Sequence, residues 1–311
     1  MYKQKLLLPF LSTIIVLFSY GCQKIYQDSS SSAESSKQCI GNNKNFSMEF
    51  FQTNNKGERF NKGINHVIVL NPKSPQLDFK VNVGLSHPIY AKDSQKNLKT
   101  KYVAKTFSEI ISDENSTLNN QKPIAAINAD YIDTANKPQG LNISRGVEYS
   151  GAFKDKRSSF GISGGNPQQR KATIFAGRRK QEILNYNLVG GNGRFYKAGN
   201  FKNICRDLGD FACNSATNRS MAGITDKGHV ILLVNDAKAK SEMEISLTNQ
   251  ELLPENFDKV LEGIAKNNCL GKVQEAILFD GGQSPGFFYN NKTYIENSGP
   301  IGSVFLIYKK P

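Results

Sequence analysis

Short apolar runs closed by glycine, proline, asparagine or aspartate recur along most of the chain, and they constrain its fold more than any other feature. Runs such as His66–Leu70, Leu77–Val83 and Val230–Val234 have the length and the β-branched content of buried strands. Residues 98–111 and 254–267 instead place apolar side chains at helical spacing. We therefore predict an α+β fold, with a mixed, largely antiparallel sheet and flanking helices in a single main domain.

The N-terminus carries an export pattern. Lysines precede an apolar run from Leu6 to Phe18, which is shorter than the roughly 20 residues that a transmembrane helix needs. The small residue Gly21 precedes Cys22, as in a bacterial lipobox. Acylation of Cys22 would anchor the protein to a membrane as a periplasmic or cell-surface lipoprotein, whereas simple secretion is the alternative.

The targeting pattern and the composition divide the chain into three parts. We predict a signal peptide with a lipobox over residues 1–22 and a tether over residues 23–45, which contains a serine-rich tract. Residues 46–311 form the predicted folded domain. A serine-rich tether is flexible and separates a membrane anchor from a folded domain, although a disordered terminus has the same composition.

Four cysteines follow Cys22, an even number that favours disulfides over metal ligation in an exported protein. Their positions, Cys39, Cys205, Cys213 and Cys269, allow three pairings. The short loop between Cys205 and Cys213 makes that pair the simplest, and it leaves Cys39 to pair with Cys269.

The chain is strongly basic, with a formal net charge of +13 and a pI of about 9.4. A protein of this charge attracts polyanions. No nucleic-acid recognition motif accompanies the basic residues, so we predict a phosphorylated or otherwise anionic glycan as the partner and no nucleic acid.

The segment Ala276–Ser284 has the composition of a functional site. Its apolar half, Ala276–Phe279, predicts a buried strand, and the turn that follows carries Asp280 to the edge of the sheet. Gly281 and Gly282 let a ligand approach the backbone closely, and their N–H groups can form an anion-binding nest. A tight turn closed by an aspartate hydrogen bond is the simpler alternative.

Three further segments occur in a characteristic order before this turn: Ile127–Asp133 followed by Gly140, then Asn218–Ile224, then Val230–Asp236. Together with the Asp280 turn they resemble the phosphodiester glycosidase family over residues 122–311. The chain departs from the family pattern where Ala129 and Asp130 replace glycines and where Gln283 replaces a third glycine. The resemblance is therefore to a divergent member.

The resemblance implies roles for individual residues. Asp280 would act as nucleophile or electrostatic stabiliser on the sugar side, and Asp130 or Asp133 would act as base for water. For these two aspartates, local turn formation is an equal alternative. The implied substrate-binding groups are Asn128, Tyr131, Gly140, Arg219, Gly281, Gly282, Gln283 and Ser284, of which Arg219 and the turn N–H groups would hold phosphate.

The function implied by the resemblance is hydrolysis of a sugar 1-phosphodiester at the glycosidic C–O bond by an envelope-associated enzyme. The rival hypothesis is a noncatalytic envelope module that binds anionic or phosphorylated glycan, which the altered motif positions favour. We predict no required cofactor and no metal site. Calcium is still a candidate ligand, because Asp130, Asp133 and Asp280 offer hard oxygen atoms.

Overall fold

The computed structural model describes residues 39–53, 64–86, 101–115, 121–150, 157–176, 186–205, 218–236, 256–296 and 299–310, which all belong to one compact unit. The predicted signal peptide and most of the predicted tether lie outside the described residues. Among the described helices, none is long and apolar enough to cross a membrane.

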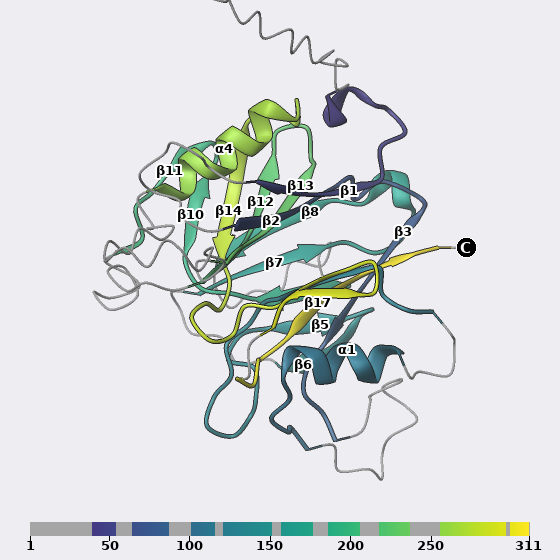
Figure 1. Ribbon diagram of the computed structural model, residues 1–311, viewed down its shortest axis with the longest axis vertical. Helices are drawn as coiled ribbons and strands as arrows, with labels where there is room; N and C mark the ends of the chain where they lie inside the picture. Colours follow the sequence, from purple (N-terminus) through teal and green to yellow (C-terminus); the bar gives the residue numbers. More distant parts are fainter. Residues whose placement is uncertain are drawn as a thin grey trace, which may run out of the picture. The chain divides into compact units, whose positions relative to one another are not determined.

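Three sheets account for most of the described chain, and every strand pair within the described residues is antiparallel (Figure 1). The seven-stranded sheet has the order β1 (Met48–Thr53), β2 (Ile64–Leu70), β13 (Val230–Asp236), β12 (Arg219–Thr225), β14 (Val273–Leu278), β10 (Arg194–Lys197), β11 (Asn200–Phe201). The first five-stranded sheet has the order β16 (Lys292–Ile295), β15 (Phe287–Tyr289), β4 (Ala125–Asn128), β17 (Val304–Lys309), β3 (Leu77–Asn82). The second has the order β6 (Val147–Ser150), β5 (Asn142–Ser144), β9 (Asn187–Gly190), β7 (Ser158–Ile162), β8 (Ala172–Ala176).

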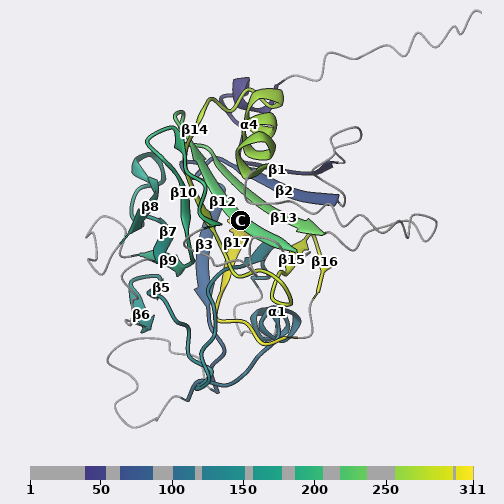
Figure 2. The ribbon, with the colours of Figure 1, turned by 90° about the vertical axis from the view of Figure 1, so that its left-hand side faces the viewer.

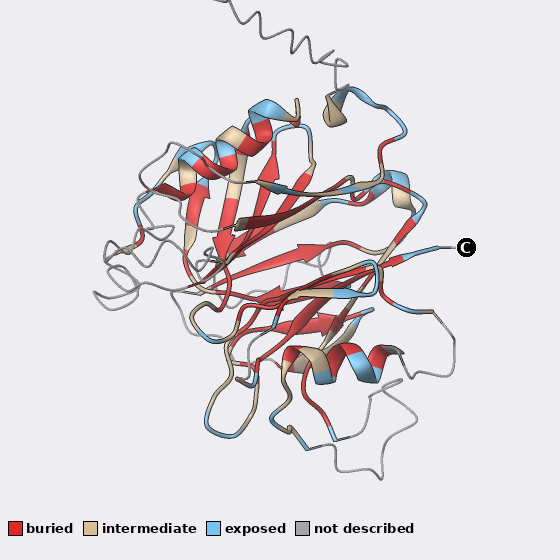
Figure 3. Cartoon of the chain, in the orientation of Figure 1, coloured by how far each residue is buried: buried red, intermediate tan, exposed pale blue. Residues whose placement is uncertain are grey.

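One central core is shared by all three sheets. Side chains alternate between the two faces of a strand, and in β13 Val230, Leu232 and Val234 point to this core. Phe305 and Ile307 of β17 and Phe160 of β7 reach it from the other two sheets. Most strands are buried along much of their length (Figure 3), and in β2 and β13 burial of both faces explains the long apolar runs.

Two α-helices within the described residues cover outer faces of these sheets. α4 (Phe257–Asn267) packs Phe257, Leu261 and Ile264 against the face of the seven-stranded sheet that the central core leaves open. α1 (Phe107–Asn115) packs in the same way against β17 and β4 of the first five-stranded sheet. Figure 2 shows the two helices on different sheets. Short 3₁₀ turns occur at Ile40–Asn42 and Pro167–Gln169.

The fold prediction is confirmed in its largely antiparallel character and corrected in detail. A mixed sheet was wrong for the described residues, and the strands divide among three sheets rather than one. The architecture is largely β, and the two α-helices within the described residues are short. Periodicity within one run of sequence cannot tell which strands pair, so the division into sheets had no local signal.

Helix α1 begins at Phe107, later than the predicted start at residue 98. The N–H of Val103 donates to Gly84 O at 3.0 Å, so the residues before the helix pair with the chain after β3 instead. Thr106 then starts the helix, because its N–H donates to Glu109 Oε2 at 2.7 Å and its hydroxyl accepts from the Glu109 N–H at 3.3 Å.

A disulfide between Cys39 and Cys269 closes a sequence separation of 230 residues, as predicted. The same segment is held by a 2.9 Å hydrogen bond from Gly41 N to Asn268 O, so residues 39–45 pack with the domain rather than extend as a tether. Cys205 is also disulfide-bonded, and its partner lies outside the described residues. The predicted Cys205–Cys213 pair therefore stays a prediction.

We expect the Cys39→Ser/Cys269→Ser double variant to lose about 3–5 kcal/mol of unfolding free energy, because a crosslink over a long loop restricts the unfolded chain. Urea denaturation measures the loss. The double variant should also respond less than the wild type to added reductant. Equal urea midpoints for variant and wild type would contradict the prediction.

Candidate active site

The site lies where β14 ends, next to the start of β12. Antiparallel pairing aligns Met221 with Leu278 and continues past the strand, where the Phe279 N–H donates to Ser220 O at 2.8 Å. This register brings Arg219 beside Asp280. The N–H of Gly282, whose φ is 69°, closes the turn by donating to Asn218 O at 3.1 Å.

Asn128, the last residue of β4, joins the first five-stranded sheet to this turn. Its Nδ2 donates to Asp280 O at 2.8 Å, and its Oδ1 accepts from the Gly286 N–H at 3.1 Å. The Asp280 N–H donates to Ala129 O at 2.8 Å. The Asn128 side chain is fully buried and satisfied within the protein, so it positions Asp280 rather than presenting a donor to a sugar.

Asp130 is completely buried two residues further along. One carboxylate oxygen accepts from the Tyr131 N–H at 2.8 Å, and the other accepts from the Gly140 N–H and from Asn142 Nδ2, both at 2.7 Å. Burial raises the pKa of Asp130 to about 6, while these donors and the charge of Arg157 lower it.

Glycines leave the space that the Asp130 carboxylate occupies. A Cβ on Gly190 would lie 2.4 Å from Asp130 Oδ2, and one on Gly140 would lie 3.0 Å from the same oxygen. Gly140 therefore donates its backbone N–H to the carboxylate and, because it has no side chain, leaves room for it. The sequence had placed it among the substrate-binding residues, but its N–H is taken by Asp130.

Tyr131 lies between the Asp130 loop and the Asp280 turn. Its hydroxyl donates to Phe279 O at 3.3 Å and accepts from Asn192 Nδ2 at 3.2 Å. The guanidinium carbon of Arg157 lies 4.5 Å from the centre of its ring. Burial, and then the charge of Asp280, raise the pKa of the tyrosine to about 12, so the hydroxyl stays protonated.

Asp280 is the carboxylate of this cluster that reaches the surface, with 8% of its area exposed. Burial raises its pKa to about 7. The hydroxyl of Ser284, the N–H of Gly281 and the charge of Arg157 lower the pKa, whereas the neighbouring charge of Asp130 raises it. A carboxyl group with a pKa near neutrality can change protonation state under physiological conditions.

The predicted anion nest is largely occupied by the protein's own groups. The Gly281 N–H bonds to the Asp280 side chain, and the Gly282 N–H bonds to Asn218 O. Gln283 is the exposed residue of this turn. Arg219 is buried, with its guanidinium carbon 5.9 Å from the centre of the Phe257 ring, and its charge acts on Tyr131.

Asp133 makes local contacts. Its Oδ1 accepts from the N–H groups of Ala135 and Lys137, both at 2.8 Å, which is the turn-forming alternative considered from the sequence. Within the part of the chain that the structure describes, no three His, Cys, Asp or Glu side chains lie together as a metal site would require. The hydrogen-bond donors around Asp130 are N–H groups of the protein, and both carboxylate oxygens accept from them.

Arg157, Asn192 and Asn142 were not predicted from the sequence. They come from separate segments of the chain, none of them in a recognised motif, and only the pairing of β5, β7 and β9 brings them to Asp130 and Tyr131. The weak signal for Asn142 was its position two residues after Gly140, at the start of a strand. No local pattern distinguished Arg157 from the other basic residues.

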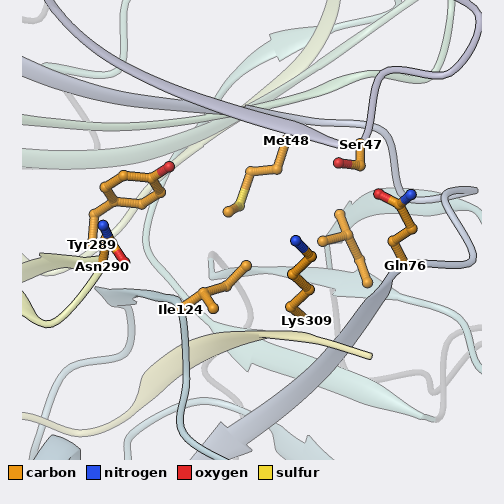
Figure 4. A pocket seen from close by; sticks show the side chains of 8 residues that line it. Ser47, Met48, Gln76, Ile124, Tyr289, Asn290 and Lys309 are labelled. Carbon is orange, nitrogen blue, oxygen red and sulfur yellow. The ribbon is translucent and has the colours of Figure 1, made fainter. Parts of the chain in front are cut away.

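A separate cavity of about 270 Å³ lies at the opposite ends of β4 and β17, where Ile124 and Lys309 line it together with Met48 and Tyr289 (Figure 4). The candidate site residues are not among those that line it. Since Asn128 lies at the other end of β4, this cavity is a different feature of the fold.

We expect Gly190→Ala to destabilise the protein by about 2–3 kcal/mol, because the added methyl group collides with a buried carboxylate. Urea denaturation measures the loss. The same substitution should cost less in an Asp130→Gly background, where the clashing side chain is absent.

Gly263→Ala is the matched control, because a Cβ at that position in α4 meets no atom within 4 Å. It should leave stability unchanged or raise it by about 0.5–1 kcal/mol. Equal effects of Gly190→Ala in the two Asp130 backgrounds would show that the contact with Asp130 is not the cause.

The chain is similar to a known protein family over the segments that carry this site. The family model for phosphodiester glycosidase matches residues 121–308, more than half of the chain. No curated protein matches the sequence. The match begins just before β4 and ends within β17, and it therefore includes Asn128, Arg219 and Asp280.

Two solved structures share the fold. The catalytic domain of zebrafish N-acetylglucosamine-1-phosphodiester alpha-N-acetylglucosaminidase, auto-inhibited by its pro-peptide, superposes with a TM-score of 0.58 at 15% identity, covering 88% of this chain and 86% of that one. A hypothetical protein from Synechocystis gives 0.54 at 12% identity, covering 85% of this chain and 62% of the other. The match to the family model, extending over all the strands that carry the site, shows that this chain belongs to the phosphodiester glycosidase family.

Proposed function

We propose that this protein is a hydrolase that cleaves a sugar 1-phosphodiester at the bond between the anomeric carbon and the phosphate oxygen. Membership of the phosphodiester glycosidase family supports the reaction class. The observation that carries the proposal is Asp280, a carboxylate that reaches the surface of the site and has a pKa of about 7. Its backbone N–H and its carbonyl oxygen are both hydrogen-bonded, so its position is fixed.

Asp280 is proposed to act on the sugar. Cleavage at the anomeric carbon passes through a state with positive charge on the ring, which an ionised carboxylate stabilises directly or by forming a covalent bond. A phosphodiester is a weakly basic leaving group, so a strong general acid is not needed. Because Asp280 must be ionised, activity should rise as pH increases through about 7.

Arg219 is proposed to act on the phosphate. The register of β12 and β14 places it beside Asp280, and a guanidinium group offers two parallel donors to phosphate oxygens. Gln283, an exposed residue, is the second proposed contact, since the N–H groups of Gly281 and Gly282 are already bonded.

The remaining predicted site residues are proposed to have structural roles, keeping the site in its arrangement. Asn128 and Asp130 are buried and their polar atoms are bonded within the protein, so neither is proposed to activate water. Asp133 closes its own turn and has no proposed catalytic role. Ser284 is proposed to orient the Asp280 carboxyl group through their hydrogen bond.

We also propose that the protein is exported and that its substrate is an anionic glycan of the cell envelope. The Cys39–Cys269 disulfide supports export, since disulfides persist in oxidising compartments. The net charge of +13 favours an anionic polymer. Lipid attachment at Cys22 remains part of the proposal, and Cys22 lies outside the described residues.

Turnover of aryl and nucleotide-linked sugar 1-phosphodiesters by the purified mature protein tests the function, with the free sugar followed by NMR at the anomeric centre. Asp280→Asn should lower kcat by about 10³-fold or more, because it removes the ionisable group and keeps the shape. Arg219→Lys should raise KM by roughly tenfold, because lysine keeps the positive charge but lacks the two parallel N–H donors of the guanidinium group.

Asp226→Asn is the matched control. Asp226 lies in the turn between β12 and β13, at the end of β12 away from the site. Its Oδ1 accepts from the Lys272 N–H at 2.9 Å, and asparagine keeps that acceptor. Its activity should equal that of the wild type. Binding of such substrates without turnover by the wild type would instead support the noncatalytic glycan-binding module, and activity retained by Asp280→Asn would refute the proposed mechanism.

A further inference from the structure

Arg157 is the positively charged residue that connects the two carboxylates of the site. It immediately precedes β7, whose strand residues are buried throughout. Its Nη2 donates to Gln139 Oε1 at 2.8 Å, and its Nη1 lies 3.7 Å from Asp130 Oδ1, within ion-pair range. The guanidinium group lies over the ring of Tyr131. These contacts fix its position on the loop between Asp130 and Gly140.

The dependence between Arg157 and Asp130 is mutual. A buried carboxylate is costly unless donors and a positive charge surround it, and Arg157 supplies that charge. In return, Asp130 restricts the guanidinium group, whose Nη1 is buried and has no hydrogen-bond partner among the described residues. The side chain of Arg157 is only 14% exposed, so solvent screens its charge weakly.

The charges of both residues of this pair act on Asp280. The tyrosine hydroxyl donates to Phe279 O, and the Asp280 N–H donates to Ala129 O, so the Asp130 loop and the Asp280 turn are locked together. The ionisable and charged groups around Asp280 are Asp130 and Tyr131 on one loop, Arg157 before β7 and Arg219 at the start of β12.

We propose that Arg157 is a positioning residue that keeps Asp280 ionised for the reaction, and that Asp130 holds Arg157 where it can do so. Asp130 alone would oppose ionisation of Asp280, since two carboxylates that share a site repel each other. Arg157 offsets part of that repulsion, and its contact with the Tyr131 ring helps to hold it beside Asp130. This inference rests on the proposed role of Asp280.

The pKa of Asp280 can be followed without any substrate. The pKa is raised on folding, so protonated Asp280 stabilises the fold below pH 4 and this contribution is lost as pH rises through about 7. An asparagine side chain at this position does not titrate. The stability difference between wild type and Asp280→Asn, measured by urea denaturation across pH 4–9, therefore falls with rising pH, and the end of the fall marks the pKa of Asp280.

In an Arg157→Gln background the end of that fall should move up by as much as about one pH unit, because a positive charge that lowers the pKa of Asp280 is gone. Arg157→Lys keeps the charge and should restore most of the wild-type profile. Gln139→Ala removes the acceptor that anchors Nη2 and should give a smaller upward movement. Gln139→Ala therefore tests the proposal even if Arg157→Gln does not fold. Arg145→Gln is the control, since Arg145 pairs with Asp78 away from the site and should cause no movement.

The acid limb of kcat/KM should move in the same direction in Arg157→Gln. If the stability profile moves and no variant or wild type turns over substrate, the positioning role stands and the proposed hydrolase function fails. If the stability profile of Arg157→Gln, or of Gln139→Ala where the former is unfolded, matches the wild type, the positioning role is overturned whatever the activity.

Discussion

The arrangement of the whole site depends on the fully buried carboxylate of Asp130. Its two oxygens need donors, and the protein supplies them from the Tyr131 and Gly140 backbone and from Asn142 in β5, while Arg157 before β7 adds a positive charge within ion-pair range. These groups come from the first and second five-stranded sheets and the loop between them. The Asp280 turn of the seven-stranded sheet is bonded to the same loop through Ala129 O. All three sheets are therefore held at one point, and Asp280 is held there with them.

Much of the fold was predictable from the sequence because its strands are buried on both faces. In β2, Ile68 and Leu70 face the central core while Val67 and Val69 face α4, and this arrangement requires the continuous apolar run seen in the sequence. The pairing of these strands was not predictable. Antiparallel neighbours such as β2 and β13 lie far apart in the chain, and nothing within either run specifies the other.

The candidate site shows the same division between local and long-range information. The turn at Asp280 and its glycines was visible in sequence, since an apolar strand must end where a carboxylate and two glycines follow it. The roles of the polar residues were harder to predict. The side-chain amide of Asn128 could bind sugar hydroxyls, yet it joins two backbone segments of the protein. Whether an amide bonds to a ligand or to the protein depends on neighbours far along the chain, as the separation of 152 between Asn128 and Asp280 illustrates.

The position of Asp130 explains how a departure from the family pattern is accommodated. The pattern that the sequence resembles has glycine there, and a glycine would carry no charge next to Asp280. An aspartate adds a second negative charge near Asp280, which by itself would favour the protonated form of Asp280. The closeness of Gly140 and Gly190 gives the new carboxylate room, and backbone donors satisfy it. Arg157 supplies a positive charge within ion-pair range of it, and Asp280 is the carboxylate of the cluster that reaches the surface.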